Sequence, residues 1–166
     1  MKSWQFTRQE KIWMGLGNQA LLDAPLTAFF SSRQCPGVAI RAAMSWALEQ
    51  AQQRQPVVSG FHSLLEQSVL KVLLQARCPV VVVLARPVAG ARLPTEWAEP
   101  LAQDRMAVVS AAASSGRLTE ELAAQRNEWV AALASQIVVA HASPGGRLAA
   151  LCDGWGYKGQ RIRWLG

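Results

Sequence analysis

Three segments of the chain combine small, hydroxyl-bearing and cationic residues, a mixture suited to binding phosphate. They are Ser31-Ser32-Arg33, Ser59-Gly60-Phe61-His62-Ser63 and Ser143-Pro144-Gly145-Gly146-Arg147. Small residues let backbone amides approach an oxyanion, and a guanidinium binds an oxyanion through two parallel hydrogen bonds. Gly and Ser are also common in turns that bind nothing, so one such segment carries little weight. Three together favour an anion site.

Arg126 adds a fourth candidate because of its place in a helical pattern. It lies four residues after Leu122 and three before Trp129, so it shares the helix face of these apolar residues. A cation on such a face either reaches out to solvent or finds an anion. Asn127 would be its polar neighbour. Arg147 begins the last predicted helix, where a cation is unfavourable unless an anion lies nearby.

The predicted ligand-binding residues are therefore Ser31, Ser32, Arg33, Ser59, Gly60, His62, Arg126, Asn127, Gly145, Gly146 and Arg147. For Arg33 a surface ion pair is the alternative, and for His62 a structural histidine. The sequence predicts no catalytic residue, no metal ligand and no cofactor. Its three cysteines are widely spaced and form no Cys-x-x-Cys pair. Residues 15–20 match the dinucleotide pattern Gly-x-Gly-x-x-Ala, but we reject this motif because residues 11–14 do not read as a strand.

Short apolar runs alternate with helical patterns along the chain, which is typical of βαβ units. We expect strands at 26–31, 56–59, 79–85, 106–110 and 137–140, with 161–164 as a candidate sixth strand. The run of valines at 80–83 predicts a central strand that is buried on both faces. Thr119 is expected to begin a helix, after a loop at 112–116.

The predicted fold class is α/β, with a doubly wound, mostly parallel sheet of five to six strands and helices on both faces. Residues 26–166 would form this single Rossmann-like domain. Residues 1–25 would be a helical or extended lead-in packed on it, with an amphipathic helix through Phe6, Ile12 and Trp13. In a parallel sheet the strands end on one side and the following helices begin there, so the candidate turns should meet at one edge.

The composition indicates a globular chain with anionic partners. Hydrophobic residues make up 51% of the 166 residues and charged residues 17%, which excludes an intrinsically disordered chain. The longest apolar run, residues 80–85, is far too short to cross a bilayer, so we expect a cytoplasmic protein with no membrane partner. The net charge of +6 favours nucleic acid or phosphorylated small molecules.

A family resemblance follows from motifs spread along nearly the whole chain. They are Leu16-Gly17-Asn18, Leu21-Leu22, residues 28–33, Val57-Val58-Ser59-Gly60, residues 80–84, Arg126-Asn127 and Gly145-Gly146-Arg147-Leu148. In order and spacing they resemble the Rossmann-like core of the DNA-processing protein A (DprA/Smf) family. The resemblance implies a homodimer that binds single-stranded DNA, helps to load a recombinase and has no catalytic turnover.

The chain departs from the family pattern at several positions. Ser31 replaces the first-turn Gly, and Leu64-Leu65-Glu66 replaces Gly-Ile-Asp. Glu128 replaces the second Arg of Arg-Asn-Arg, and Ala140 replaces a Glu after the fifth strand. Gly145-Gly146-Arg147 stands where the family has Ser-Gly-Ser.

Three functions follow, and the first is a non-catalytic module that binds a nucleotide or single-stranded DNA. The second is an enzyme like the "lonely guy" nucleoside-monophosphate phosphoribohydrolases of the wider superfamily. Pro144-Gly145-Gly146 matches the start of their motif, but the Gly-Thr and catalytic Glu that should follow are missing, so activity would depend on Glu66 or Glu128. The third is a degenerate member of the fold that acts as an oligomerising or protein-interaction domain.

Overall fold

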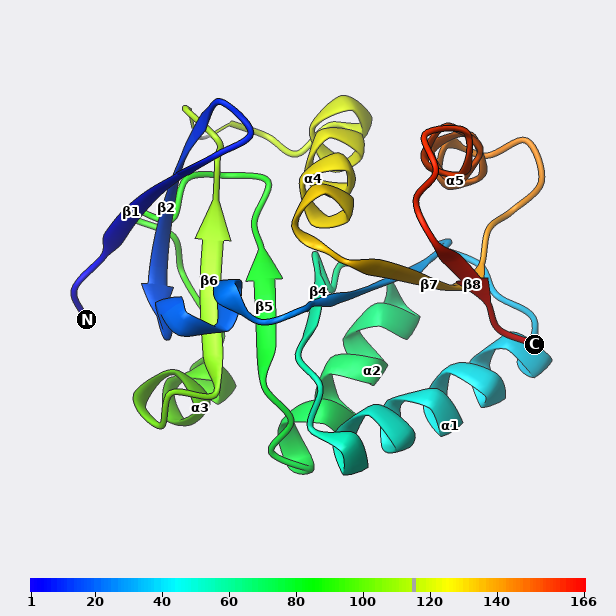
Figure 1. Ribbon diagram of the computed structural model, residues 1–166, viewed down its shortest axis with the longest axis horizontal. Helices are drawn as coiled ribbons and strands as arrows, with labels where there is room; N and C mark the ends of the chain where they lie inside the picture. Colours follow the sequence, from blue (N-terminus) through cyan, green and yellow to red (C-terminus); the bar gives the residue numbers. More distant parts are fainter. Residues whose placement is uncertain (115) are drawn as a thin grey trace.

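A twisted sheet of eight strands runs through the computed structural model, which describes residues 1–114 and 116–166 (Figure 1). The strands are β1 Trp4–Arg8, β2 Lys11–Gly17, β3 Thr27–Ser31, β4 Val57–Ser59, β5 Val80–Val83, β6 Met106–Ser110, β7 Gln136–His141 and β8 Ile162–Trp164. Their order across the sheet is β1-β2-β6-β5-β4-β3-β7-β8. Ser115, inside the loop predicted at 112–116, lies outside the described residues.

The six strands from β3 to β8 pair in parallel, which confirms the predicted α/β class. The valine strand β5 lies between β4 and β6 and is buried along its whole length, as predicted. A central parallel strand has helices over both faces and therefore needs no polar alternation. The predicted strand number of five to six is too low by the two strands that come from the first seventeen residues.

Helices cover both faces of the sheet (Figure 1). On one face lie α1 Gly37–Gln53, α2 Leu64–Gln75 and α3 Ala98–Ala102, with the 3-10 turn η2 Thr95–Trp97 before α3; on the other lie α4 Glu120–Leu133 and α5 Arg147–Tyr157. The 3-10 turn η1 Gln19–Asp23 joins β2 to β3. Successive residues of β3 serve the two layers, since Phe29 stacks on Trp46 of α1 and Phe30 lies against Trp155 of α5.

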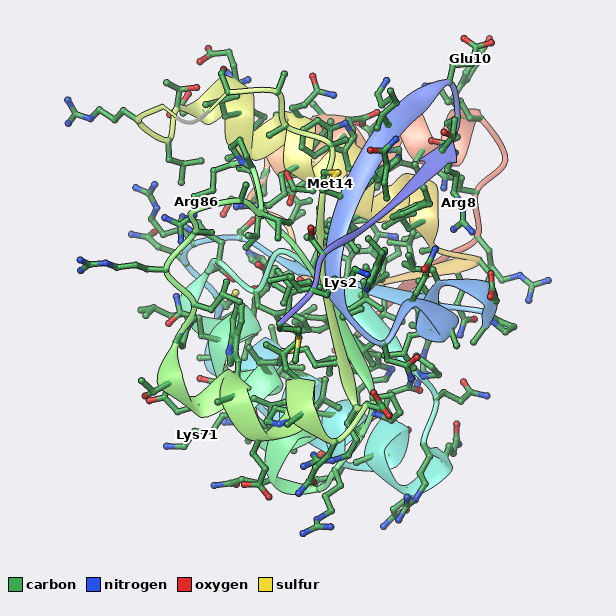
Figure 2. All side chains as sticks on the ribbon, turned by 90° about the vertical axis from the view of Figure 1, so that its left-hand side faces the viewer. Lys2, Arg8, Glu10, Met14, Lys71 and Arg86 are labelled. Carbon is green, nitrogen blue, oxygen red and sulfur yellow. The ribbon has the colours of Figure 1, made fainter. Side chains whose placement is uncertain are left out.

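The amino-terminal lead-in is a β-hairpin, so the predicted helix through Phe6, Ile12 and Trp13 is wrong. Strands β1 and β2 pair antiparallel, and β2 then pairs antiparallel with β6. Figure 2 looks onto this edge of the sheet and shows the hairpin in front, with Glu10 at its tip. Gln9 and Glu10 form the tip with φ of 54° and 62°. Both values lie in the left-handed region, as a tight two-residue hairpin requires.

The hairpin also explains why the glycine pattern at 15–20 is no dinucleotide site. The segment before it is a strand after all, which corrects the reason for rejecting the motif, but that strand is antiparallel and leads into η1 and not into an α-helix. A Cβ on Gly15 would overlap the ring of Trp4 on β1. Among the described residues, none of the helices has the length and apolarity needed to cross a membrane.

The hairpin places two neighbouring residues on opposite faces of β2, so their substitution should affect the free energy of unfolding differently. Trp13 is 1% exposed and packs against Phe6 and Trp129, whereas Ile12 on the other face of β2 is 62% exposed. Trp13→Ala should therefore lower the free energy of unfolding by about 3–5 kcal/mol, because it leaves a cavity in the core. Ile12→Ala, the matched control, should change it by less than about 0.5 kcal/mol in the same urea titration. Similar losses for both would contradict the alternation of a strand.

Candidate functional site

The candidate site lies where the sheet changes its winding direction. Strand β3 is flanked by β4 on one side and β7 on the other. The helix after β3, α1, covers one face of the sheet, and the helix after β7, α5, covers the opposite face (Figure 1). The two connections diverge and leave a crevice beyond the carboxyl ends of these strands. Ligands of open α/β sheets bind at this kind of switch point.

A cleft of about 940 Å³ opens at this point, between the β3–α1 turn, the start of α2, α4 and the β7–α5 turn. It collects nine of the eleven predicted residues, namely Ser31, Ser32, Arg33, His62, Arg126, Asn127, Gly145, Gly146 and Arg147. Gly60 lines a smaller neighbouring cavity of about 310 Å³, which shares His62 and Arg126 with the cleft. The structure thus brings ten of the predicted residues to one edge of the sheet.

Ser59 is the predicted residue that lies below the cleft and not in it. It has no exposed surface, and its hydroxyl accepts a hydrogen bond from the backbone N–H of Phe61 at 3.0 Å. This bond stabilises the tight turn after β4, where Phe61 has a φ of 48°. Ser59 therefore shapes the turn, and its side chain contacts no part of the cavity.

Arg126 is the most buried cation of the site, with 6% of its surface exposed. One terminal nitrogen donates to Oδ1 of Asn127 at 3.4 Å, and Nε has no partner among the described residues. None of the ion pairs formed within residues 1–114 and 116–166 includes Arg126. Burial lowers the pKa of Arg126, and the nearby Glu66 opposes this effect. A buried guanidinium without a bound carboxylate has the chemistry to accept an anion as ligand.

Gly60 leaves the room that Arg126 occupies. A Cβ at position 60 would lie 2.7 Å from Cδ and 2.9 Å from Cζ of Arg126, closer than van der Waals contact allows. The Arg126 side chain therefore lies directly over the backbone of the turn after β4. The absence of a side chain at position 60 thus allows the approach of an arginine, and the predicted role of Gly60 in ligand binding stays a prediction.

Glu66 is the important residue that the sequence analysis did not place in the site. It is 4% exposed, and its carboxylate accepts hydrogen bonds from the backbone N–H groups of Ser31 at 3.0 Å, His62 at 2.9 Å and Ser63 at 3.2 Å. With Ser63 it forms the capping box of α2. The Ser-x-x-Glu spacing is typical of this cap and could have predicted it. The bond to Ser31 joins α2 to the end of β3, and only the folded chain reveals it.

The remaining charged side chains of the cleft differ in exposure and in whether they form ion pairs. Arg33 is exposed and has no ion-pair partner among the described residues. Arg147 lies 3.5 Å from a carboxylate oxygen of Glu120 and 3.8 Å from one of Glu121, at the start of α4. Arg147 begins a helix, where a cation is unfavourable unless an anion lies nearby, and these two acids are such anions. Partial burial and the neighbouring Arg126 lower the pKa of His62.

The turn between β7 and α5 offers free backbone donors. Gly146 is the N-cap of α5 and provides no side-chain cap, so no side chain takes the N–H groups of the first helical turn. Gly145 precedes it with a φ of 73°, a conformation that favours glycine. Ser32 holds this turn against β3, because its hydroxyl accepts the N–H of Ser143 at 2.8 Å. The amino end of α5 therefore faces the cleft with its amides available.

The carboxylates that a hydrolase would need are engaged elsewhere. Both carboxylate oxygens of Glu66 accept hydrogen bonds, from three backbone amides in total. Glu128 accepts the indole N–H of Trp155 at 2.8 Å and so joins α4 to α5. Neither carboxylate has the freedom that a general acid or base requires.

Comparison with known proteins identifies the family. A sequence model of the family "DNA recombination-mediator protein A" matches residues 6–150. The chain belongs to this family. This confirms the resemblance found in the motifs. A search of curated proteins gives no match.

Two solved structures of the family share the fold. DNA processing protein A of Streptococcus pneumoniae matches with a TM-score of 0.75 and 17% identity over 92% of this chain and 54% of that one, so the chain spans about half of that protein. The Helicobacter pylori protein, described with a single-stranded DNA binding mode, matches with a TM-score of 0.79 and 14% identity over 98% and 80% of the two chains. The molybdenum cofactor carrier protein of Chlamydomonas reinhardtii shares the fold more distantly, with a TM-score of 0.57 and 12% identity over 84% and 76%.

The contact between Gly60 and Arg126 can be tested by a double-mutant cycle. Gly60→Ala should lower the free energy of unfolding by about 1–3 kcal/mol, because the new methyl group collides with the buried guanidinium. In the Arg126→Ala background this loss should nearly vanish. Gly154→Ala on α5, where a Cβ meets open space, should be stabilising by about 0.5–1 kcal/mol. A penalty at position 60 that survives the removal of Arg126 would show that another contact is responsible.

Proposed function

We propose that the cleft binds a backbone phosphate of single-stranded DNA and carries out no turnover. The observation that carries this proposal is the buried guanidinium of Arg126, which borders the cleft without a carboxylate partner among the described residues. Membership of a DNA recombination-mediator family and the net charge of +6 support a nucleic-acid ligand. The single-stranded DNA binding described for the Helicobacter pylori relative supports the same choice.

The phosphate would sit between α4 and the amino end of α5. Arg126 would donate from below, the free amides of Arg147 and Leu148 would donate from the helix end, and Arg33 would close the outer side. Helix amino ends attract anions through their unpaired N–H groups and their partial positive charge. Asn127, Ser32 and Gly145 line the same cleft and hold its walls. The proposal includes the homodimer that the family resemblance implies.

Removal of the buried guanidinium should weaken DNA binding more than removal of a surface charge. Arg126→Ala should raise the Kd for a fluorescein-labelled 12-mer of thymidylate about 10- to 100-fold, the value of one charge-assisted hydrogen-bonding group. Lys71→Ala, on the exposed side of α2 (Figure 2), removes the same charge away from the cleft and should change Kd less than about twofold. Fluorescence anisotropy at constant salt measures both, with melting temperatures as the folding control. Equal losses in both variants would mean that net charge alone binds the DNA.

Binding should also strengthen as the pH falls through the range of His62. In the free protein the pKa of His62 lies below its ordinary value of 6.5, so His62 is neutral at pH 7.5. A bound phosphate favours the protonated ring and raises this pKa, and binding therefore takes up a proton. The Kd should fall about 3- to 10-fold between pH 7.5 and pH 5.5, because protonated His62 adds one charged hydrogen-bond donor to the site. His62→Gln should make the profile flat, and an unchanged profile in this variant would rule out His62 as its source.

A further inference from the structure

The anion site at the start of α2 is already filled by the protein itself. This helix begins in one of the three turns that the sequence marks as phosphate sites, and the cleft is lined at its start by His62, Ser63, Leu64 and Glu66. Glu66 has placed a carboxylate there, where it accepts the N–H groups of His62 and Ser63 with one oxygen. The other oxygen accepts the N–H of Ser31 from the β3–α1 turn. Amide donors from two of the three candidate turns are thus used by a single internal anion.

A second internal anion reduces the charge on the opposite wall. Glu120 lies in the cleft lining and pairs with Arg147, which is the arginine at the start of α5. Three arginines and two glutamates line the cleft, so their formal charge is +1 with His62 neutral. Arg126, Arg33 and the free amides of α5 remain as the donors for a ligand.

We infer that Glu66 is a specificity-determining residue: it blocks a second phosphate position and thereby restricts the cleft to one singly charged phosphodiester. This inference rests on the proposed function and names the class of ligand more closely. A pyrophosphate group would bring its second phosphate next to a carboxylate that is 4% exposed and bound to three amides. That contact joins like charges where little water can screen them. Internal phosphates of a DNA strand carry one charge each and avoid it.

A series of thymidine ligands tests the inference in competition with the labelled 12-mer. Thymidine 5′-methylphosphate, thymidine 5′-monophosphate and thymidine 5′-diphosphate share one nucleoside and differ in charge. Attraction to a basic chain with a net charge of +6 would by itself make the diphosphate the strongest competitor. We expect the reverse order, with the methyl ester at least as strong as the diphosphate. A diphosphate that competes about 10-fold better in the wild-type chain would overturn the inference.

Variants of Glu66 separate specificity from stability. Glu66→Ala frees three amides beside the cleft, so the affinity for the diphosphate relative to the methyl ester should rise about 10-fold. Lys71→Ala is the control and should leave this ratio unchanged. A loss of affinity for all three ligands in equal proportion would show that Glu66 is only structural and would overturn the inference. Glu66→Gln, which keeps the side-chain shape but removes the charge, should shift the ratio in the same direction.

Three further outcomes are distinguishable. If neither variant folds, the order of the three ligands in the wild-type chain still decides the question. If the 12-mer does not bind the wild-type chain at all, the proposed function fails, whatever the order of the small ligands. If the 12-mer binds and the diphosphate is preferred, the proposed function stands and the role of Glu66 falls.

Discussion

The burial of one guanidinium over one glycine is the contact around which the candidate site is built. Arg126 can lie at the carboxyl end of β4 only because Gly60 has no side chain and because α4 crosses the sheet at that point. A buried cation without a bound carboxylate costs free energy, and the protein offsets only part of this cost through the nearby charge of Glu66. The positive charge of Arg126 is therefore only partly compensated within the protein, and the phosphate that we propose as ligand would compensate the rest.

Several departures from the family pattern form a consistent structural set. Glu66, in place of the Asp that the resemblance implies, reaches three amides and so ties α2 to β3. Ser31, in place of a Gly, places its hydroxyl 2.7 Å from that of Ser63 across the same junction. Glu128, in place of an Arg, binds Trp155 and fixes α4 to α5. Each residue takes part in an internal hydrogen bond, and the Glu at position 128 also replaces a cation of the family pattern. This region of the chain is consequently less positively charged than the family motif would make it.

The order of elements made much of the fold and the edge of the site predictable, because parallel strands must end together. Strand β6 and the helix cap at Thr119 lie where local pattern places them. The hairpin escaped prediction because its tip is Gln9-Glu10, and neither residue signals the left-handed conformation that both adopt. The ion pairs of Arg147 and the hydrogen bond between Ser31 and Glu66 could not be predicted either, because they join residues that are 26 or more positions apart in the sequence. Local sequence identifies which groups can bind an anion, but only the folded chain shows which of them are already occupied.

That distinction also bears on whether the site performs chemistry. A hydrolase needs a carboxylate that is free to stabilise charge or move a proton at the bond being broken. Here Glu66 is a buried acceptor for three amides, and Glu120 forms an exposed ion pair with Arg147. Among the described residues, the cleft keeps the guanidinium groups of Arg33 and Arg126, the imidazole of His62 and the first amides of α5 without a carboxylate partner. Guanidinium groups and helix amides can hold an anion through hydrogen bonds, which suits the phosphate binding that we propose for this cleft.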